Sequence, residues 1–128
     1  MSARHLTLGR QGEDAAAALL TRLGLSVLER NWSCRAGEID LICRDGDVLV
    51  FVEVKTRGPS SLASGEDAVD AGKRTRIARA AALYLSRTDG WGGPCRFDVV
   101  VVTPRGETLE ARHVPDAFQA PAGGWQPW

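Results

Sequence analysis

The chain has 128 residues, 44% hydrophobic and 25% charged, which excludes a disordered or fibrous protein and predicts one globular domain. Lys and Arg number 16, as do Asp and Glu, so the formal net charge of zero argues against binding nucleic acid through overall charge. The 3 cysteines form no C-x-x-C pair, which predicts reduced thiols. No signal peptide or membrane span is recognisable, so we expect a cytoplasmic protein without membrane contact.

Hydrophobic periodicity and turn residues predict the element order α-β-β-β-α-β-β. The predicted ranges are a helix over about 7–23, strands over about 25–30, 37–43 and 48–56, a helix over about 70–87, and strands over about 96–103 and 108–114. Asp70 is a suitable N-cap for the second helix. Without an internal repeat or a long linker, we expect a single domain over residues 1–120 and a flexible, Gly- and Pro-rich tail over 121–128.

The segment between the second and third predicted strands contains Asp45-Gly46, a strong hairpin signal. A turn at these two residues would place Glu38 opposite Glu53 and make Asp40 a diagonal neighbour of Glu53. Because side chains alternate, one face would carry the apolar side chains of Ile39, Leu41, Val48, Val50, Val52 and Val54. The other face would carry Glu38, Asp40, Glu53 and Lys55.

This acidic face has two interpretations. Opposed carboxylates destabilise a sheet, and a divalent cation between Asp40 and Glu53 would relieve their repulsion. Oxygen-only ligands favour Mg²⁺ or Mn²⁺ over zinc. The alternative is a solvated polar face, which is common in antiparallel pairs. Lys55 would stabilise negative charge on a phosphate or, in the alternative, pair with a carboxylate across the strands.

Glu13 lies at the edge of the apolar stripe of the first predicted helix. A carboxylate that leans toward the core needs a partner, because an unpaired buried charge is costly. We therefore expect Glu13 to join the acidic face. The alternative is a capping role near the start of the helix.

Basic residues cluster downstream of the hairpin. The residues that would suit phosphate binding are Arg57, Lys73, Arg74, Arg76 and Arg79. A solvated helix face is the alternative. The sequence contains no Walker A, G-x-G-x-x-G or G-x-S-x-G motif, so neither a nucleotide cofactor nor a serine hydrolase triad is expected.

The hairpin sequence Gly37-Glu38-Ile39-Asp40-Leu41-Ile42, followed by Val50-Phe51-Val52-Glu53-Val54-Lys55, resembles the D…E-x-K signature of the restriction-endonuclease-like, PD-(D/E)XK, superfamily. Over about residues 5–118 the chain is similar to the YraN family of small bacterial proteins. The supporting residues are Gly12-Glu13, Asn31, Val69, Lys73 and Arg96-Phe97-Asp98-Val99. The chain has Ile39 where the superfamily name has Pro. The resemblance implies an α/β fold of three layers around a mixed central sheet.

The resemblance also implies site roles. Asp40 and Glu53 would be metal ligands, with the backbone carbonyl of Val54 as a third. Lys55 would orient or activate the attacking water, and Glu13 matches the helix-one acid of Holliday-junction resolvases. The implied function is Mg²⁺- or Mn²⁺-dependent hydrolysis of phosphodiester bonds in DNA, including branched DNA. The rival is a DNA-binding or partner-binding module without catalysis, and the oligomeric state stays open, with a homodimer as one option.

Overall fold

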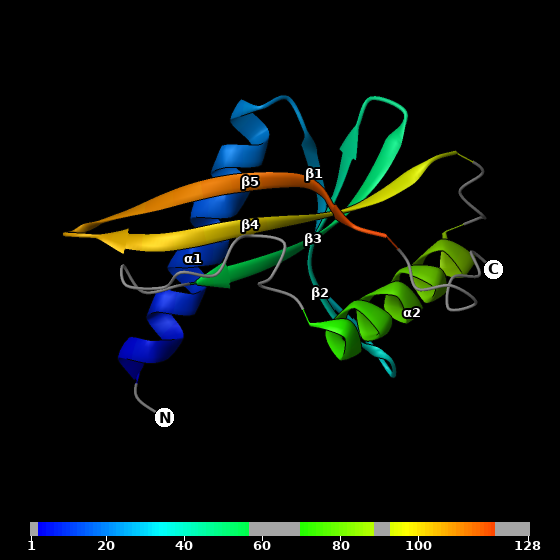
Figure 1. Ribbon diagram of the computed structural model, residues 1–128, viewed down its shortest axis with the longest axis horizontal. Helices are drawn as coiled ribbons and strands as arrows, with labels where there is room; N and C mark the ends of the chain where they lie inside the picture. The colour runs from blue at the N-terminus through cyan, green and yellow to red at the C-terminus, as the bar shows by residue number, and fades with distance from the viewer. Residues whose placement is uncertain (1–2, 57–69, 89–92, 120–128) are drawn as a thin grey trace.

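The computed structural model describes residues 3–56, 70–88 and 93–119 (Figure 1). Its elements are α1 (Ala3–Arg22), β1 (Ser26–Cys34), β2 (Gly37–Asp45), β3 (Val48–Thr56), α2 (Ala71–Arg87), β4 (Cys95–Arg105) and β5 (Thr108–Phe118). The predicted order α-β-β-β-α-β-β is confirmed. Arg57 and the predicted tail over 121–128 lie outside the described residues.

The strands form one sheet in the order β1-β2-β3-β4-β5. The pairing of β3 with β4 is parallel and the other three pairings are antiparallel, so the sheet is mixed. α1 and α2 pack against opposite faces of this sheet (Figure 1). The predicted three-layer α/β architecture is thus confirmed. Within the described ranges, neither helix is long and apolar enough to cross a membrane.

Each face of the sheet has its own apolar core. On the α2 side, the buried side chains include Ile42, Phe51, Ile77, Tyr84, Leu85 and Phe97. On the α1 side, they include Ala16, Leu20, Leu41, Val50, Val52 and Val100. β3 and β4 contribute to both cores, because their alternate side chains point to opposite faces. These two central strands therefore form the rigid frame around which the remaining elements are placed.

The hairpin between β2 and β3 differs from the prediction by two residues of register. Asp45 pairs with Val48, so Gly46 and Asp47 form the turn. Gly46 has φ +59° and stands first in the loop, as in a type II′ turn, whereas the expected Asp-Gly turn places glycine second. A shift of two residues keeps the alternation of side chains, so the two faces of the hairpin keep most of their predicted residues.

Ile39 is the exception to the predicted faces. It packs in the core beneath α2, whereas Leu41 packs on the α1 side. The last pair between β2 and β3 is Leu41 with Val52, and beyond it β2 pairs with β1 alone. Strand twist carries this end of β2 away from β3 and toward α2. We call the region where residues 37–40 of β2 separate from residues 53–56 of β3 the sheet fork.

A buried carboxylate joins β4 to β5 and to the end of β2. Asp98 is fully buried and accepts hydrogen bonds from Arg96 Nε (2.9 Å) and from the backbone N–H of Asp116 (2.9 Å). His113 Nε2 lies 2.7 Å from its other oxygen, and Arg96 Nη1 also donates to Asp45 (3.0 Å). Burial raises the pKa of Asp98, but the bonds from His113 and Arg96 outweigh it and hold that pKa below its ordinary value. The Arg96-Phe97-Asp98-Val99 segment therefore links β4 to β2 and β5.

Candidate metal centre at the sheet fork

Close packing of α1 on the sheet brings Glu13 to the fork. Gly12 is buried, and a Cβ added to it would lie 2.9 Å from Thr56 Oγ1 and 3.9 Å from Val102 Cγ1. A side chain at position 12 would therefore require Thr56 or the helix to shift. Glu13 follows Gly12 and is half-buried. Since α1 begins at Ala3, Glu13 lies beyond its first turn, and the capping alternative is excluded.

Replacing Gly12 with Ala is expected to displace α1 and to lower stability by about 1–3 kcal/mol, the usual cost of overpacking. The same displacement moves Glu13, so we also expect weaker binding of Mg²⁺ at the candidate metal centre. Urea unfolding and calorimetric titration measure the two effects. Gly9 is the matched control, because a Cβ there would meet nothing within 4 Å. Gly9→Ala should raise stability through helix propensity, and equal behaviour of the two variants would contradict the packing argument.

Asp40 lies at the point where the fork opens. Its Oδ2 accepts a hydrogen bond from the backbone N–H of Val54 (2.8 Å), which fixes the carboxylate of β2 against β3. Burial and the neighbouring charge of Glu53 raise the pKa of Asp40 from 3.8 to about 8, although the bond from Val54 acts in the opposite direction. The ionised form of Asp40 is therefore costly without a cation beside it.

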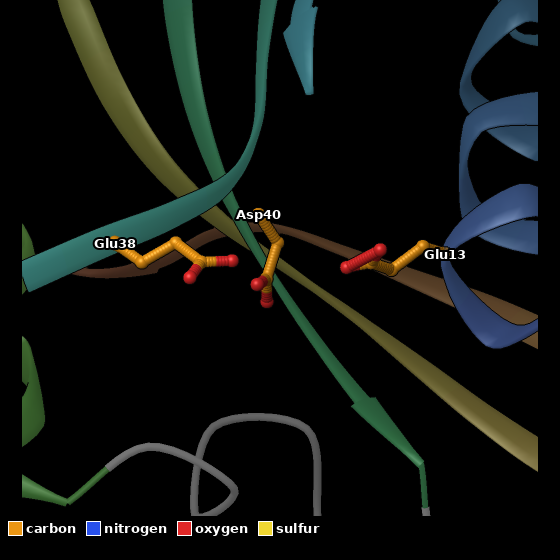
Figure 2. A group of neighbouring side chains, drawn as sticks. All are labelled: Glu13, Glu38 and Asp40. Carbon is orange, nitrogen blue, oxygen red and sulfur yellow. The ribbon is translucent and has the colours of Figure 1, made fainter. Parts of the chain in front are cut away.

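Three carboxylates converge at this position. Oxygen atoms of Glu13, Glu38 and Asp40 all lie within 4.8 Å of one another. Figure 2 shows Glu13 reaching across from α1 toward Asp40, with Glu38 approaching from the other side along β2. The side chains of Glu13 and Asp40 are half-buried, and that of Glu38 is exposed. This all-oxygen set suits Mg²⁺ or Mn²⁺.

Glu38 was not among the predicted ligands. The predicted register placed Glu38 opposite Glu53, and we interpreted Glu38 only as a carboxylate that repels Glu53. The signal that identifies it is simple alternation, because Glu38 and Asp40 are two residues apart on one strand and share a face.

Glu53 is buried, with 5% of its surface exposed, and it contacts two lysines. Lys73 Nζ, from the first turn of α2, lies 2.6 Å from Glu53 Oε1. Lys55 Nζ lies 3.6 Å from the same oxygen. Burial lowers the pKa of Lys73, but the contact with Glu53 outweighs it and holds that pKa above its ordinary value. The carboxylate of the predicted E-x-K motif is thus neutralised by ammonium groups.

The basic residues at the start of α2 point in different directions. Lys73 contacts Glu53, and the Arg74 guanidinium lies 5.4 Å from the centre of the Phe118 ring. Arg76 and Arg79 are exposed. Arg76 flanks the fork, since its Cβ is 3.9 Å from the position of a Cβ added to Gly37. For Arg76 and Arg79 phosphate binding stays a prediction, while Lys73 and Arg74 have partners within the protein.

Comparisons with known proteins cover the whole site. The profile described as "Uncharacterised protein family UPF0102" matches residues 12–102. A UPF0102 protein of Nitratidesulfovibrio vulgaris (strain DP4) is 48% identical over 134 residues, which cover 100% of this chain and 99% of the relative. A UPF0102 protein of Symbiobacterium thermophilum is 49% identical over 114 residues (88% of this chain, 97% of the relative). One from Lawsonia intracellularis is 42% identical over 127 residues (94% and 96%). These descriptions name no reaction.

Proposed function

We propose that this chain, which belongs to the UPF0102 (YraN) family, catalyses the Mg²⁺- or Mn²⁺-dependent hydrolysis of phosphodiester bonds in DNA. The observation that carries this proposal is the convergence of Glu13, Glu38 and Asp40 beside the lysine-paired Glu53. Carboxylates gathered at a half-buried position repel one another, and a divalent cation offsets that repulsion.

The residues present fit such a cation. Asp40 and Glu53 are the proposed principal ligands, with Glu13, Glu38 and the backbone carbonyl of Val54 completing the oxygen set. The hydrogen bond from Val54 N–H to Asp40 supports the proposal, because a backbone partner that orients a ligand is what a preorganised site requires. A bound Mg²⁺ or Mn²⁺ supplies polarisation of a phosphoryl oxygen and a lowered pKa of bound water.

Lys55 has a separate role in this proposal. A protonated ammonium group donates hydrogen bonds but has no lone pair, so it cannot ligate a cation. Its proximity to Glu53 places it beside the proposed ligands, 3.6 Å from Oε1. There Lys55 would orient the attacking water and stabilise the negative charge that develops on the phosphate.

The proposed substrate is DNA, with branched DNA as the preferred class, and the proposed location is the cytoplasm. Arg76 and Arg79, together with Arg57, would contact the phosphate backbone. A second candidate is a DNA-binding or partner-binding module without catalysis. It is favoured by one observation, that Glu53 has a counterion from the protein itself in Lys73, 2.6 Å from Oε1.

Incubation with single-stranded, duplex, flapped and four-way-junction DNA separates the two candidates. We expect cleavage in the presence of Mn²⁺ and none in EDTA. Electrophoretic mobility shifts on the same substrates report binding independently of cleavage. Binding without cleavage on every substrate in Mn²⁺ would contradict the nuclease proposal and favour the binding module.

A further inference from the structure

The buried carboxylate Glu53 has two cationic groups of the protein itself within 4 Å. Lys73 Nζ lies 2.6 Å from Glu53 Oε1, at the short end of charge-assisted hydrogen bonds. The 3.6 Å contact of Lys55 with the same oxygen is longer. Lys73 is therefore the closer of these two counterions of the carboxylate. A divalent ion at the fork would have to share Glu53 with this ammonium group or replace it.

Charge argues for replacement. A lysine ammonium in contact with a proposed metal ligand repels a divalent cation, and the repulsion grows as burial lowers the effective dielectric constant. With Lys55 also beside Glu53, the carboxylate already has two monovalent cations within 4 Å. Moving one of these ammonium groups away from Glu53 would reduce the electrostatic repulsion that a divalent metal ion meets there.

Lys73 is also able to leave without unfolding the site. Its backbone is anchored, because Lys73 N–H donates to Oδ1 of the N-cap residue Asp70 (2.9 Å). Its side chain is flexible and 31% exposed, so the ammonium group can move into solvent while α2 stays in place. A departing ammonium would remain at the rim of the fork, beside exposed Arg76 of the same helix.

We propose that Lys73 is an exchangeable counterion for Glu53: its ammonium neutralises the carboxylate in the metal-free protein and yields it when a divalent cation binds. The released ammonium is then free to contact a DNA phosphate. This inference rests on the proposed function, since it requires a metal ion at the fork. It assigns Lys73 a positioning role that depends on the metal state.

Calorimetric titration with Mg²⁺ tests the exchange. Lys73→Met keeps the length of the side chain and removes its charge, and it should bind Mg²⁺ about tenfold more tightly than wild type. Lys73→Gln is a second neutral variant with the same expectation. Lys73→Arg keeps the charge and should bind Mg²⁺ no more tightly than wild type. Arg87→Ala, exposed at the C-terminal end of the same helix, is the matched control and should change the affinity less than about twofold.

Thermal unfolding gives a second readout. In EDTA, Lys73→Met should melt at least about 5 °C below wild type, because Glu53 loses the closer of its two counterions. Saturating Mg²⁺ should close most of that difference. A purely structural lysine would produce the same deficit with and without Mg²⁺.

The outcomes separate the two proposals. Unchanged or weaker Mg²⁺ binding by both neutral variants, with a wild type that binds Mg²⁺, would overturn the exchange and leave the metal centre intact. A wild type that binds neither Mg²⁺ nor Mn²⁺ would overturn the metal centre itself, and the pair of Lys73 with Glu53 would then be permanent.

Discussion

Replacing Asp40 with Asn is expected to abolish Mg²⁺ binding and DNA cleavage together. The amide oxygen of Asn can still accept the hydrogen bond from Val54 N–H, so the fork should keep its shape while it loses a negative charge. We expect the affinity for Mg²⁺ to fall at least about 100-fold, since the remaining carboxylates lack their central member. Calorimetry and the DNA substrates measure the two losses.

The same substitution should make the metal-free protein more stable at alkaline pH. Burial and the charge of Glu53 raise the pKa of Asp40 to about 8 in the fold, so the folded state binds a proton that the unfolded state has released. The stability that this proton gives wild type is present below the unfolded pKa of 3.8 and is lost as the pH rises through about 8. Wild type should thus lose stability relative to Asp40→Asn between these limits in EDTA.

Asp47→Asn is the matched control for Asp40→Asn. Asp47 lies in the exposed turn of the same hairpin, away from the fork, and its replacement should leave both metal binding and cleavage unchanged. If Asp40→Asn bound Mg²⁺ as tightly as wild type, the carboxylate cluster would not be a metal site.

Replacing Lys55 with Ala is expected to separate catalysis from metal binding. Cleavage should fall by about 10²–10³-fold, the usual loss when a donor that stabilises developing charge is removed. A protonated Lys55 cannot ligate a cation, so the substitution removes none of the proposed ligands. The affinity for Mg²⁺ should stay within about threefold of wild type or improve slightly, because a nearby positive charge is gone.

Single-turnover cleavage and calorimetry measure the two effects of Lys55→Ala separately. DNA affinity should decrease only by the contribution of one phosphate contact. Arg112→Ala removes an exposed positive charge from β5 and should leave the cleavage rate unchanged. Cleavage by Lys55→Ala at the wild-type rate would mean that Lys55 is only a counterion of Glu53.

The order of elements could be predicted because its signals are local. Apolar spacing marked both helices, and the run from Val48 to Thr56 coincides with β3. Asp70 is the N-cap of α2, as expected. The register of the hairpin could not be read from Asp-Gly alone, because a glycine in the first or the second loop position gives registers that differ by two residues. The position of Ile39 depends on where β2 leaves β3, and side-chain alternation contains no information about that separation.

The candidate site was predictable in part for the same reason. Asp40, Glu53 and Lys55 share a face by alternation, and Glu13 lies at the edge of an apolar stripe. The contact of Lys73 with Glu53 depends instead on how α2 lies across the sheet, which no local pattern specifies. Sequence reasoning grouped Lys73 with Arg74, Arg76 and Arg79 as phosphate contacts. The structure places Lys73 on Glu53, and whether it also contacts phosphate stays a prediction.

Because β3 pairs in parallel with β4, the chain cannot complete its fold early in synthesis on the ribosome. Glu13, Asp40 and Glu53 are all made before α2, but the strand that covers the open side of β3 begins only at Cys95. Until β4 emerges from the ribosome, the core on the α1 side lacks Val100 and Val102. Pairing of β3 with β4 is also intrinsically slow, because the two strands are far apart in the sequence. A nascent chain therefore carries all three acidic residues, from the synthesis of Glu53 until that of β4, without the complete packing that gathers them. The carboxylates take up their final arrangement only when folding is nearly complete.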